Sequence, residues 1–370
     1  MNTVVGFSSE KNPEAVVNDL KKQFGEFESR LIIFFASSAY DPDTLNKAMF
    51  DGFSDTARVF GCTTAGEIIS GKMLKNSVVA MGLNSDLLDD VHIEVVNGIS
   101  GDCDLTPAFS SFERHYGRPV DELDFSKFVG IILADGLQGA EERIMDEIGD
   151  RTNITFIGGS AGDDLKFEKT FVFADGRTYS DAAILALLKP ATGFDIIKTQ
   201  SFRPLDKHLR VTRADTANRE VIEFNHKPAA VAYAEAVDIP VEKAATRFMR
   251  NPVGLMVDGE PFVRSPQQIL TENRMKFYCN VLEGMDLTVL ESEDIVIDTR
   301  EAVAKKQAEL GGISGIINFH CILRTLELEA KNQTLAYGRI FSDIPTIGFS
   351  TYGEEYLGHI NQTSTMLVFK

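Results

Sequence analysis

Glycine, hydroxyl and carboxylate side chains stand together at three places in this sequence. Gly61–Glu67 and Gly348–Glu354 both follow the pattern G-x-[ST]-T-x-G-E, and Gly158–Asp163 is a shorter version that ends in Asp163. Glycine lets a backbone approach a ligand closely, hydroxyls donate or accept hydrogen bonds, and a carboxylate accepts them. Residues of these types predict loops that bind a small polar ligand. The alternative is a structural role, in which the glycines form tight turns and the carboxylates cap helices. The candidate ligand-binding residues are Thr63, Thr64, Glu67, Ser160, Asp163, Ser350, Thr351 and Glu354.

Arg324 is a basic side chain whose position calls for an anion. We expect it at the start of a helix that follows a buried strand, where a cation opposes the helix dipole. Its guanidinium therefore needs an anionic partner, either Glu354 or the carboxylate of a ligand. In a pocket, Arg324 would bind the carboxylate of a zwitterion and Glu354 its amine. The alternative is a direct ion pair between the two with a structural role.

Cys321 directly follows His320, a pair that suggests a thiol enzyme. Neighbouring residues on a strand point to opposite faces, so these two are poorly placed as nucleophile and base. A free cysteine is more typically a small buried residue. A thiol-dependent hydrolase therefore ranks below a ligand-binding role, in which Cys321 is also a candidate contact.

His359, Asn361 and Thr363 alternate along the chain just after the third loop. In an extended conformation all three would point to the same side. Such a side fits the polar wall of a pocket, with Asn361 and Thr363 as candidate ligand contacts. It fits a solvated edge strand equally well.

Each glycine-rich loop follows the second of two apolar runs that predict buried strands. The paired runs are residues 31–36 and 59–62, residues 128–133 and 156–159, and residues 313–319 and 346–349, with a helical pattern inside each pair. Apolar strands joined by a helix are typical of parallel pairing. We therefore expect an α/β fold of mixed, largely parallel sheets, built from an internal repeat of strand-helix-strand units. Ligands bind such sheets beyond the carboxyl ends of the strands, where these loops lie.

The pattern changes after residue 200. Short apolar runs flank a polar segment at residues 215–218, which predicts a β-hairpin, and we expect helices over residues 229–236 and 241–249. We place a domain boundary near residue 225. The two predicted domains are then residues 1–225 and residues 226–370.

The composition argues against several classes of partner. The chain has 370 residues with 55 acidic and 37 basic side chains, which gives a net charge of −18. This charge disfavours nucleic acid and anionic membranes, because both bind through Lys and Arg. The sequence contains no apolar run near the ~18 residues that cross a bilayer, no recognisable signal peptide and no cysteine pair that suggests a metal site. Four scattered cysteines are typical of a reduced, cytoplasmic protein.

The ordered motifs resemble those of the FIST family of sensory proteins, with a FIST N-terminal region to about residue 225 and a FIST C-terminal region after it. The resemblance rests on Phe60–Glu67, Gly158–Asp163, Phe319–Arg324, Gly348–Glu354 and His359–Thr363. It implies a sensor that binds a small ligand, with amino acids as the family's proposed ligands. It also implies regulation of a separate signalling protein, because no kinase, cyclase or methyl-accepting region is recognisable here.

The same resemblance implies an alternative function, because some family members are described as haem-binding nitric-oxide sensors. Such a sensor would regulate a separate histidine kinase or a cyclic-di-GMP enzyme. Any of the six histidines could supply an axial ligand, and His226 and His320 are the first candidates, since one follows a predicted strand and the other ends one. We expect a ligand-binding signalling protein and not an enzyme. No catalytic residue and no firm cofactor are assigned.

Overall fold

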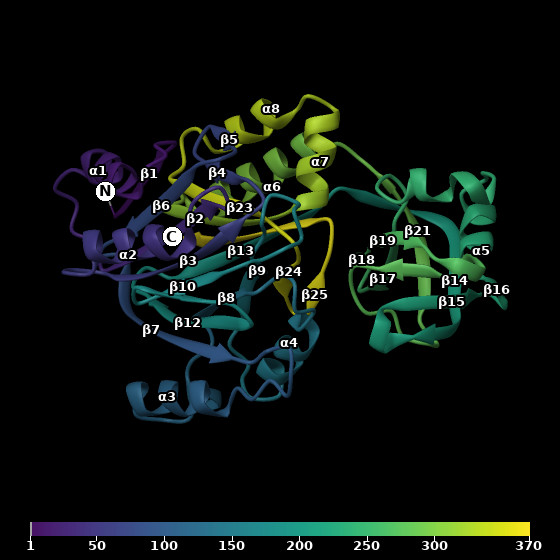
Figure 1. The fold of residues 1–370 in the computed structure, drawn as a ribbon, viewed down its shortest axis with the longest axis horizontal. Helices are drawn as coiled ribbons and strands as arrows, with labels where there is room; N and C mark the ends of the chain where they lie inside the picture. Colours follow the sequence, from purple (N-terminus) through teal and green to yellow (C-terminus); the bar gives the residue numbers. More distant parts are fainter. Residues whose placement is uncertain (1) are drawn as a thin grey trace. The chain divides into compact units, whose positions relative to one another are not determined.

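The computed structural model describes residues 2–370, and the chain folds into two compact units. The first unit is formed by the chain up to Lys198 together with Thr299–Gly358 and Ser364–Lys370. The second is formed by Thr199–Asp298 and His359–Thr363. Strands from both ends of the chain therefore belong to the first unit, where the yellow strand β23 lies beside the purple strand β4 (Figure 1).

The first unit contains most of the regular structure. Its helices, including those with most of their residues in this unit, are α1 (Pro13–Phe24), α2 (Pro42–Phe53), α3 (Thr106–Tyr116), α4 (Glu141–Gly149), α6 (Ile295–Leu310), α7 (Ile322–Ala330) and α8 (Thr334–Gly338), with short 3-10 helices η1 (Val120–Glu122) and η5 (Arg339–Phe341). Its strands are β1 (Thr3–Ser8), β2 (Leu31–Ser37), β3 (Arg58–Thr64), β4 (Glu67–Ile69), β5 (Lys72–Leu74), β6 (Val78–Leu83), β7 (Leu88–Asn97), β8 (Val129–Ala134), β9 (Phe156–Ser160), β10 (Val172–Ala174), β11 (Arg177–Tyr179), β12 (Ala182–Pro190), β13 (Phe194–Gln200), β22 (Gly315–Cys321), β23 (Thr346–Thr351), β24 (Glu354–Tyr356) and β26 (Thr363–Phe369). Within residues 2–370, no helix combines the length and the apolar character that crossing a membrane requires.

These strands form mixed sheets in the orders β1-β6-β2-β3-β10-β11, β24-β9-β8-β12-β7 and β13-β26-β22-β23-β4-β5. The pairs β2–β3, β8–β9 and β22–β23 are parallel, whereas most other pairings are antiparallel. The α/β class is confirmed, but the expectation of largely parallel sheets is wrong, and repeated strand-helix-strand units do not account for the sheets. The reason is that β6, β12 and β26 each lie antiparallel against the first strand of a parallel pair.

The short strand that follows each parallel pair joins a different sheet. Strand β4, which follows β3, pairs with β23, and β24, which follows β23, pairs with β9. Strand β10, which follows β9, pairs with β3. Each glycine-rich motif therefore lies where the chain leaves one sheet for another.

Strand β2 and helix α2 show why these residues adopt these elements. Every residue of β2 is buried, as its apolar composition requires. Helix α2 begins after Asp41, whose side chain accepts a hydrogen bond from the Thr44 N–H and so satisfies a free donor of the first turn. Its Leu45 and Met49 are buried in one cluster with Phe34. Burial of each such side chain contributes about 1.5–3 kcal/mol.

The second unit is built around one antiparallel sheet of order β18-β17-β21-β14-β15-β20-β19, with β16 paired to β15. Its elements are β14 (Phe202–Asp215), η2 (Thr216–Asn218), β15 (Glu220–Phe224), β16 (Lys227–Pro228), α5 (Ala229–Ala236), η3 (Val241–Arg247), β17 (Val253–Val257), β18 (Glu260–Arg264), β19 (Pro266–Ile269), η4 (Thr271–Asn273), β20 (Met275–Phe277), β21 (Asp286–Ser292) and β25 (His359–Ile360). The predicted hairpin and the helix over residues 229–236 are confirmed. The second expected helix is a 3-10 helix.

Candidate functional site

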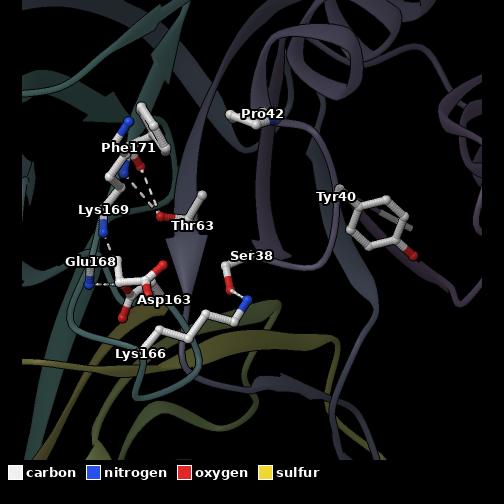
Figure 2. Close-up of a pocket in the computed structure, with 9 residues that line it drawn as sticks. All are labelled: Ser38, Tyr40, Pro42, Thr63, Asp163, Lys166, Glu168, Lys169 and Phe171. Atoms are coloured by element: carbon white, nitrogen blue, oxygen red, sulfur yellow. Dashed lines mark hydrogen bonds between the residues drawn. The ribbon is translucent and has the colours of Figure 1, made fainter.

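A cavity of about 140 Å³ opens in the first unit where strands β2 and β3 end (Figure 2). It is lined by Ser38, Tyr40, Pro42, Thr63, Asp163, Lys166, Glu168, Lys169 and Phe171. These residues come from the turn between β2 and α2 and the first residue of α2, from the end of β3, and from the loop between β9 and β10. Because β2 and β3 are parallel, the cavity lies at the carboxyl ends of neighbouring strands, where ligands commonly bind α/β sheets.

Asp163 shapes the loop that forms one wall of the cavity. Its carboxylate accepts hydrogen bonds from the backbone N–H groups of Phe167 (2.9 Å), Glu168 (2.7 Å) and Lys169 (3.0 Å), and from the hydroxyl of Tyr352. Burial raises the pKa of the Asp163 carboxyl, but these hydrogen bonds outweigh burial and the net pKa is lowered. Asp163 therefore stays ionised and holds the loop folded around its carboxylate.

A second set of contacts ties the same loop to the end of β2. The Asp164 carboxylate accepts from the Ser37 hydroxyl (2.9 Å), the Ser38 N–H (3.1 Å) and the Ser38 hydroxyl (2.7 Å). The Lys166 ammonium donates to the Ser38 hydroxyl oxygen at 2.9 Å, and Figure 2 shows the Lys166 side chain extending to Ser38. The Ser38 hydroxyl is thus held between an ammonium and a carboxylate.

Side chains of both charges line the cavity. Lys166 and Lys169 supply positive charge, and Asp163 and Glu168 supply negative charge. Lys166, Glu168 and Lys169 are exposed, so their charged ends can reorient toward a ligand. A cavity with this lining can hold a small ligand that carries both charges.

Hydroxyl groups and an aromatic ring complete the lining. The Thr63 hydroxyl accepts a hydrogen bond from the Phe171 N–H at 3.0 Å. The Tyr40 hydroxyl donates to the Glu10 carbonyl at 2.9 Å and points away from the cavity (Figure 2). Burial, reinforced by the nearby charges of Glu67 and Glu10, raises the pKa of Tyr40 to about 12, so its hydroxyl stays neutral.

Thr64 and Glu67, two candidates from the first motif, do not line this cavity. Both are buried, and the Thr64 hydroxyl donates to the Glu67 carboxyl at 2.5 Å. The Ser77 N–H and hydroxyl donate to the other Glu67 oxygen at 3.1 and 2.6 Å. Burial raises the pKa of Glu67 to about 7, although hydrogen bonds from Ser77 and Thr64 oppose it. Glu67 is therefore a buried group that exchanges a proton near neutral pH.

Ser160, a candidate from the second motif, bridges two buried carboxyl groups. Its hydroxyl lies 2.9 Å from Glu355 Oε1 and 3.1 Å from Glu141 Oε1. One hydroxyl proton can serve only one of these oxygens, so the other contact requires a protonated carboxyl. Burial, followed by the charge of Glu141, raises the pKa of Glu355 well above its ordinary value, so Glu355 is the protonated partner. The sequence reasoning missed Glu355.

Arg324 and the candidates Ser350, Thr351 and Glu354 from the motif Gly348–Glu354 are buried in the first unit. Arg324 is 1% exposed, and its guanidinium donates to the Thr299 hydroxyl at 3.1 Å. The Thr351 hydroxyl lies 3.3 Å from the Glu354 carboxyl. The Ser350 hydroxyl pairs with that of Thr325 at 2.8 Å. None of these residues lines the cavity at the ends of β2 and β3.

Asn361 and Thr363 belong to the second unit, whereas Arg324, Thr351 and Glu354 belong to the first. The Asn361 amide lies 3.4 Å from the His359 imidazole. The expected extended run through residues 359–363 is wrong, because β25 ends before Asn361 and Gln362 has a left-handed φ of 49°. A turn before β26 therefore breaks the alternation of side chains.

His320 and Cys321 lie at the end of β22, and both are buried. The His320 imidazole contacts the Tyr337 hydroxyl through Nδ1 at 3.0 Å. Burial, and then the charge of Arg324, lowers the pKa of His320 well below its ordinary value, so the ring is neutral. His226 is exposed in the turn between β15 and β16. Neither histidine lines the cavity at the ends of β2 and β3.

Thr63 and Asp163 are the two lining residues that the motifs singled out. The other lining residues carry weaker local signals. Ser38 follows a buried strand at its carboxyl end, and Lys166 and Lys169 fall within six positions of Asp163. Only the folded chain shows that these segments meet.

Comparisons with known proteins identify the family. The model of the FIST N domain matches residues 30–227, and the model of the FIST C domain matches residues 229–356. A protein of Methanocaldococcus jannaschii, described as uncharacterized, is 25% identical over 282 residues, which are 71% of this chain and 54% of that protein. The chain thus spans about half the length of that relative. FIST domains are associated with signal-transduction sensors. Because the two models together match most of the chain, it belongs to the FIST family.

Proposed function

We propose that this chain is a sensor that binds a small ligand in the cavity between Ser38, Thr63 and Lys169. One observation carries the proposal: the cavity opens at the carboxyl ends of two parallel strands and presents hydroxyls and both charges. Membership in the FIST family supports a signalling role. The sensor would act on a separate protein, a histidine kinase or a cyclic-di-GMP enzyme.

The size of the cavity favours a ligand as small as an amino acid. Its volume is about 140 Å³. A protein cavity of ~150 Å³ holds benzene, a ligand of about six non-hydrogen atoms, which is the size of L-alanine. The ligand carboxylate would face Lys166 and Lys169, and its ammonium would face the exposed Glu168 carboxylate.

Calorimetric titration of the full chain tests this proposal. The probes are L-alanine, glycine, acetate and methylamine, of which the last two carry one charge each. We expect L-alanine to bind more tightly than acetate or methylamine. Lys169→Ala should weaken L-alanine binding ~10–100-fold, because a hydrogen bond to a charged group contributes about 1.5–3 kcal/mol. Lys127→Ala is the matched control, since Lys127 is exposed and lies outside the cavity.

The alternative site, with Arg324 and Glu354 as ligand contacts, makes the opposite prediction for the same titration. If Arg324 is the anchor, Arg324→Lys should abolish binding in a folded protein while Lys169→Ala leaves it unchanged. That result would move the site away from the cavity. Failure of all four probes to bind the wild type would overturn the proposed sensor site.

Of the two candidate haem ligands, His320 offers a buried Nε2 that has no hydrogen-bond partner among residues 2–370. The ring is wholly buried and its Nδ1 contacts Tyr337, so a haem iron could reach Nε2 only by opening the sheet. His320 as placed does not fit a haem. We expect no Soret band after incubation of the purified chain with haemin. A Soret band that is lost in His320→Ala would contradict this.

The thiol-hydrolase alternative depends on Cys321. This side chain is 2% exposed, and the neighbouring His320 imidazole contacts Tyr337. We therefore expect Cys321→Ser to leave L-alanine binding unchanged. A hydrolytic activity that this substitution abolishes would contradict the sensor assignment.

A further inference from the structure

The segment Asp163–Thr170, here called the strap, forms one wall of the cavity and is held in an unfavourable backbone conformation. Asp164, Leu165 and Phe167 have positive φ values of 56°, 63° and 55°. Left-handed backbone is costly for residues that carry a Cβ. The strap therefore keeps this conformation only because other contacts hold it.

Those contacts converge on two points. At the first, the Asp163 carboxylate gathers three backbone N–H groups of the strap and the hydroxyl of Tyr352. At the second, the Ser38 hydroxyl donates to Asp164 at 2.7 Å and accepts from Lys166 at 2.9 Å. Ser38 and Lys166 both line the cavity, so the second point is open to a ligand.

The outer face of the strap is apolar. Phe167 is 57% exposed and Leu165 is 38% exposed. The Phe167 ring stacks on Tyr352, with ring centroids 5.0 Å apart and planes at 22°. The Tyr352 hydroxyl accepts from the Leu165 N–H at 2.8 Å. Tyr352 thus links the outer face of the strap to Asp163 at the cavity wall.

We propose that the strap converts occupancy of the cavity into a change at the surface. A ligand carboxylate takes the Lys166 ammonium from Ser38, and the strap then shifts so that Phe167 leaves Tyr352. This inference rests on the proposed function, because it uses the same cavity. A carboxylate is a stronger acceptor for an ammonium than a hydroxyl is, so the exchange favours the ligand. In this proposal the ligand carboxylate completes its contacts with Lys166 in the shifted state, and that difference between the two states supplies the differential affinity that a population shift requires.

A tryptophan reporter tests the shift. The chain has no tryptophan, so Phe167→Trp places a single indole on the outer face of the strap. The full-length variant is titrated with L-alanine while acrylamide quenching of the indole is measured. We expect the quenching constant to rise about twofold at saturation as the ring leaves Tyr352. Its midpoint should equal the calorimetric Kd of the same variant.

Two further variants make the readout specific. Phe125→Trp is the matched control, since Phe125 is 63% exposed and lies outside both the strap and the cavity lining. Its quenching should not change with L-alanine. Tyr352→Phe in the Phe167→Trp chain removes the hydroxyl that links Leu165 to Asp163. It should raise quenching without ligand and reduce the increment that L-alanine produces.

The outcomes separate this inference from the proposed function. Calorimetric binding of L-alanine with unchanged quenching in Phe167→Trp overturns the strap shift and leaves the sensor site standing. Absence of binding of all four probes to the wild type overturns both. If Phe167→Trp does not fold, Leu165→Trp reports from the same face of the strap, and an unchanged signal there has the same meaning.

Discussion

Glu67 is the buried side chain whose proton is most sensitive to ordinary changes of pH. Burial raises its pKa from 4.5 to about 7, against the opposing hydrogen bonds from Ser77 and Thr64. Between these two values the folded chain holds a proton that the unfolded chain has released. The folded state binds more protons there, so the free energy of unfolding falls as pH rises through this window.

Glu67→Gln should remove this pH dependence. Between pH 5 and pH 8 the wild type should lose about 2.5 kcal/mol more stability than the variant, because one pKa unit corresponds to about 1.4 kcal/mol and just under two pKa units of the change fall in this range. The amide resembles the protonated carboxyl, because its oxygen can accept from Ser77 while its nitrogen donates to the Thr64 hydroxyl oxygen. Urea unfolding at each pH measures the difference. The exposed Glu113→Gln is the control, and parallel pH profiles for wild type and Glu67→Gln would contradict the prediction.

For single residues, the sequence indicates which side chains could bind a ligand. It does not indicate which contacts each of them makes in the folded protein. The motifs pointed to Thr63 and Asp163, and both line the cavity. The Asp163 carboxylate, however, is already bonded to its own loop. Lys166 could not be recognised in advance, because its contact with Ser38 joins positions 128 residues apart.

Glycines inside the parallel strand pairs allow the strands to approach each other closely. In the second strand of each pair, a Cβ on one glycine would lie 1.8–2.2 Å from the carbonyl oxygen of the neighbouring strand. These glycines and the facing residues are Gly61 with Phe34, Gly158 with Ile132, and Gly348 with Asn318. The first glycine of each motif is thus explained by strand packing, where its spacing had suggested a turn or a ligand loop.

Gly158→Ala should therefore destabilise the first unit. The nearest atoms to the new methyl group are backbone atoms of Ile132, which cannot move aside as the end of a side chain can. We expect a loss of about 3 kcal/mol, at the upper end of ordinary overpacking. Gly149→Ala is the control, because no atom lies within 4 Å of its Cβ. Thermal unfolding compares the two, and equal midpoints would contradict this account of the glycines.

The strand direction was harder to predict than the strands themselves. An apolar run such as Val78–Leu83 is buried in full, and its composition is the same for parallel and antiparallel pairing. The paired runs and the helix between them are local features, so they were visible in the sequence. Strands β4, β10 and β24 each pair with a strand that is distant in the sequence and belongs to another sheet. No local sequence pattern predicts such a pairing.

On the scale of the whole molecule, the first unit depends on both ends of the chain. Strand β4 pairs with β23, and the Phe35 ring packs on Phe349 with centroids 4.5 Å apart. The family models meet between residues 227 and 229, whereas packing places Thr299–Gly358 in the first unit. The predicted domain limit near residue 225 stays a prediction.

A fragment of residues 1–225 should not fold by itself. It would expose the edges of β4 and β9, together with the apolar surface around Phe35 that the C-terminal strands cover. We expect aggregation, or thermal unfolding without a cooperative transition, in size-exclusion chromatography and circular dichroism. The full chain is the control. A soluble fragment with a cooperative transition near that of the full chain would contradict the prediction.

Ligand binding at the ends of β2 and β3 is tested most directly by hydrogen–deuterium exchange of the full chain with and without L-alanine. We predict slower exchange in peptides covering residues 38–44 and altered exchange in peptides covering residues 163–171. The exchange rates of peptides that contain Arg324 or Glu354 should be the same with and without L-alanine. Protection confined to the peptides with Arg324 and Glu354, with no change over residues 163–171, would contradict the proposed site.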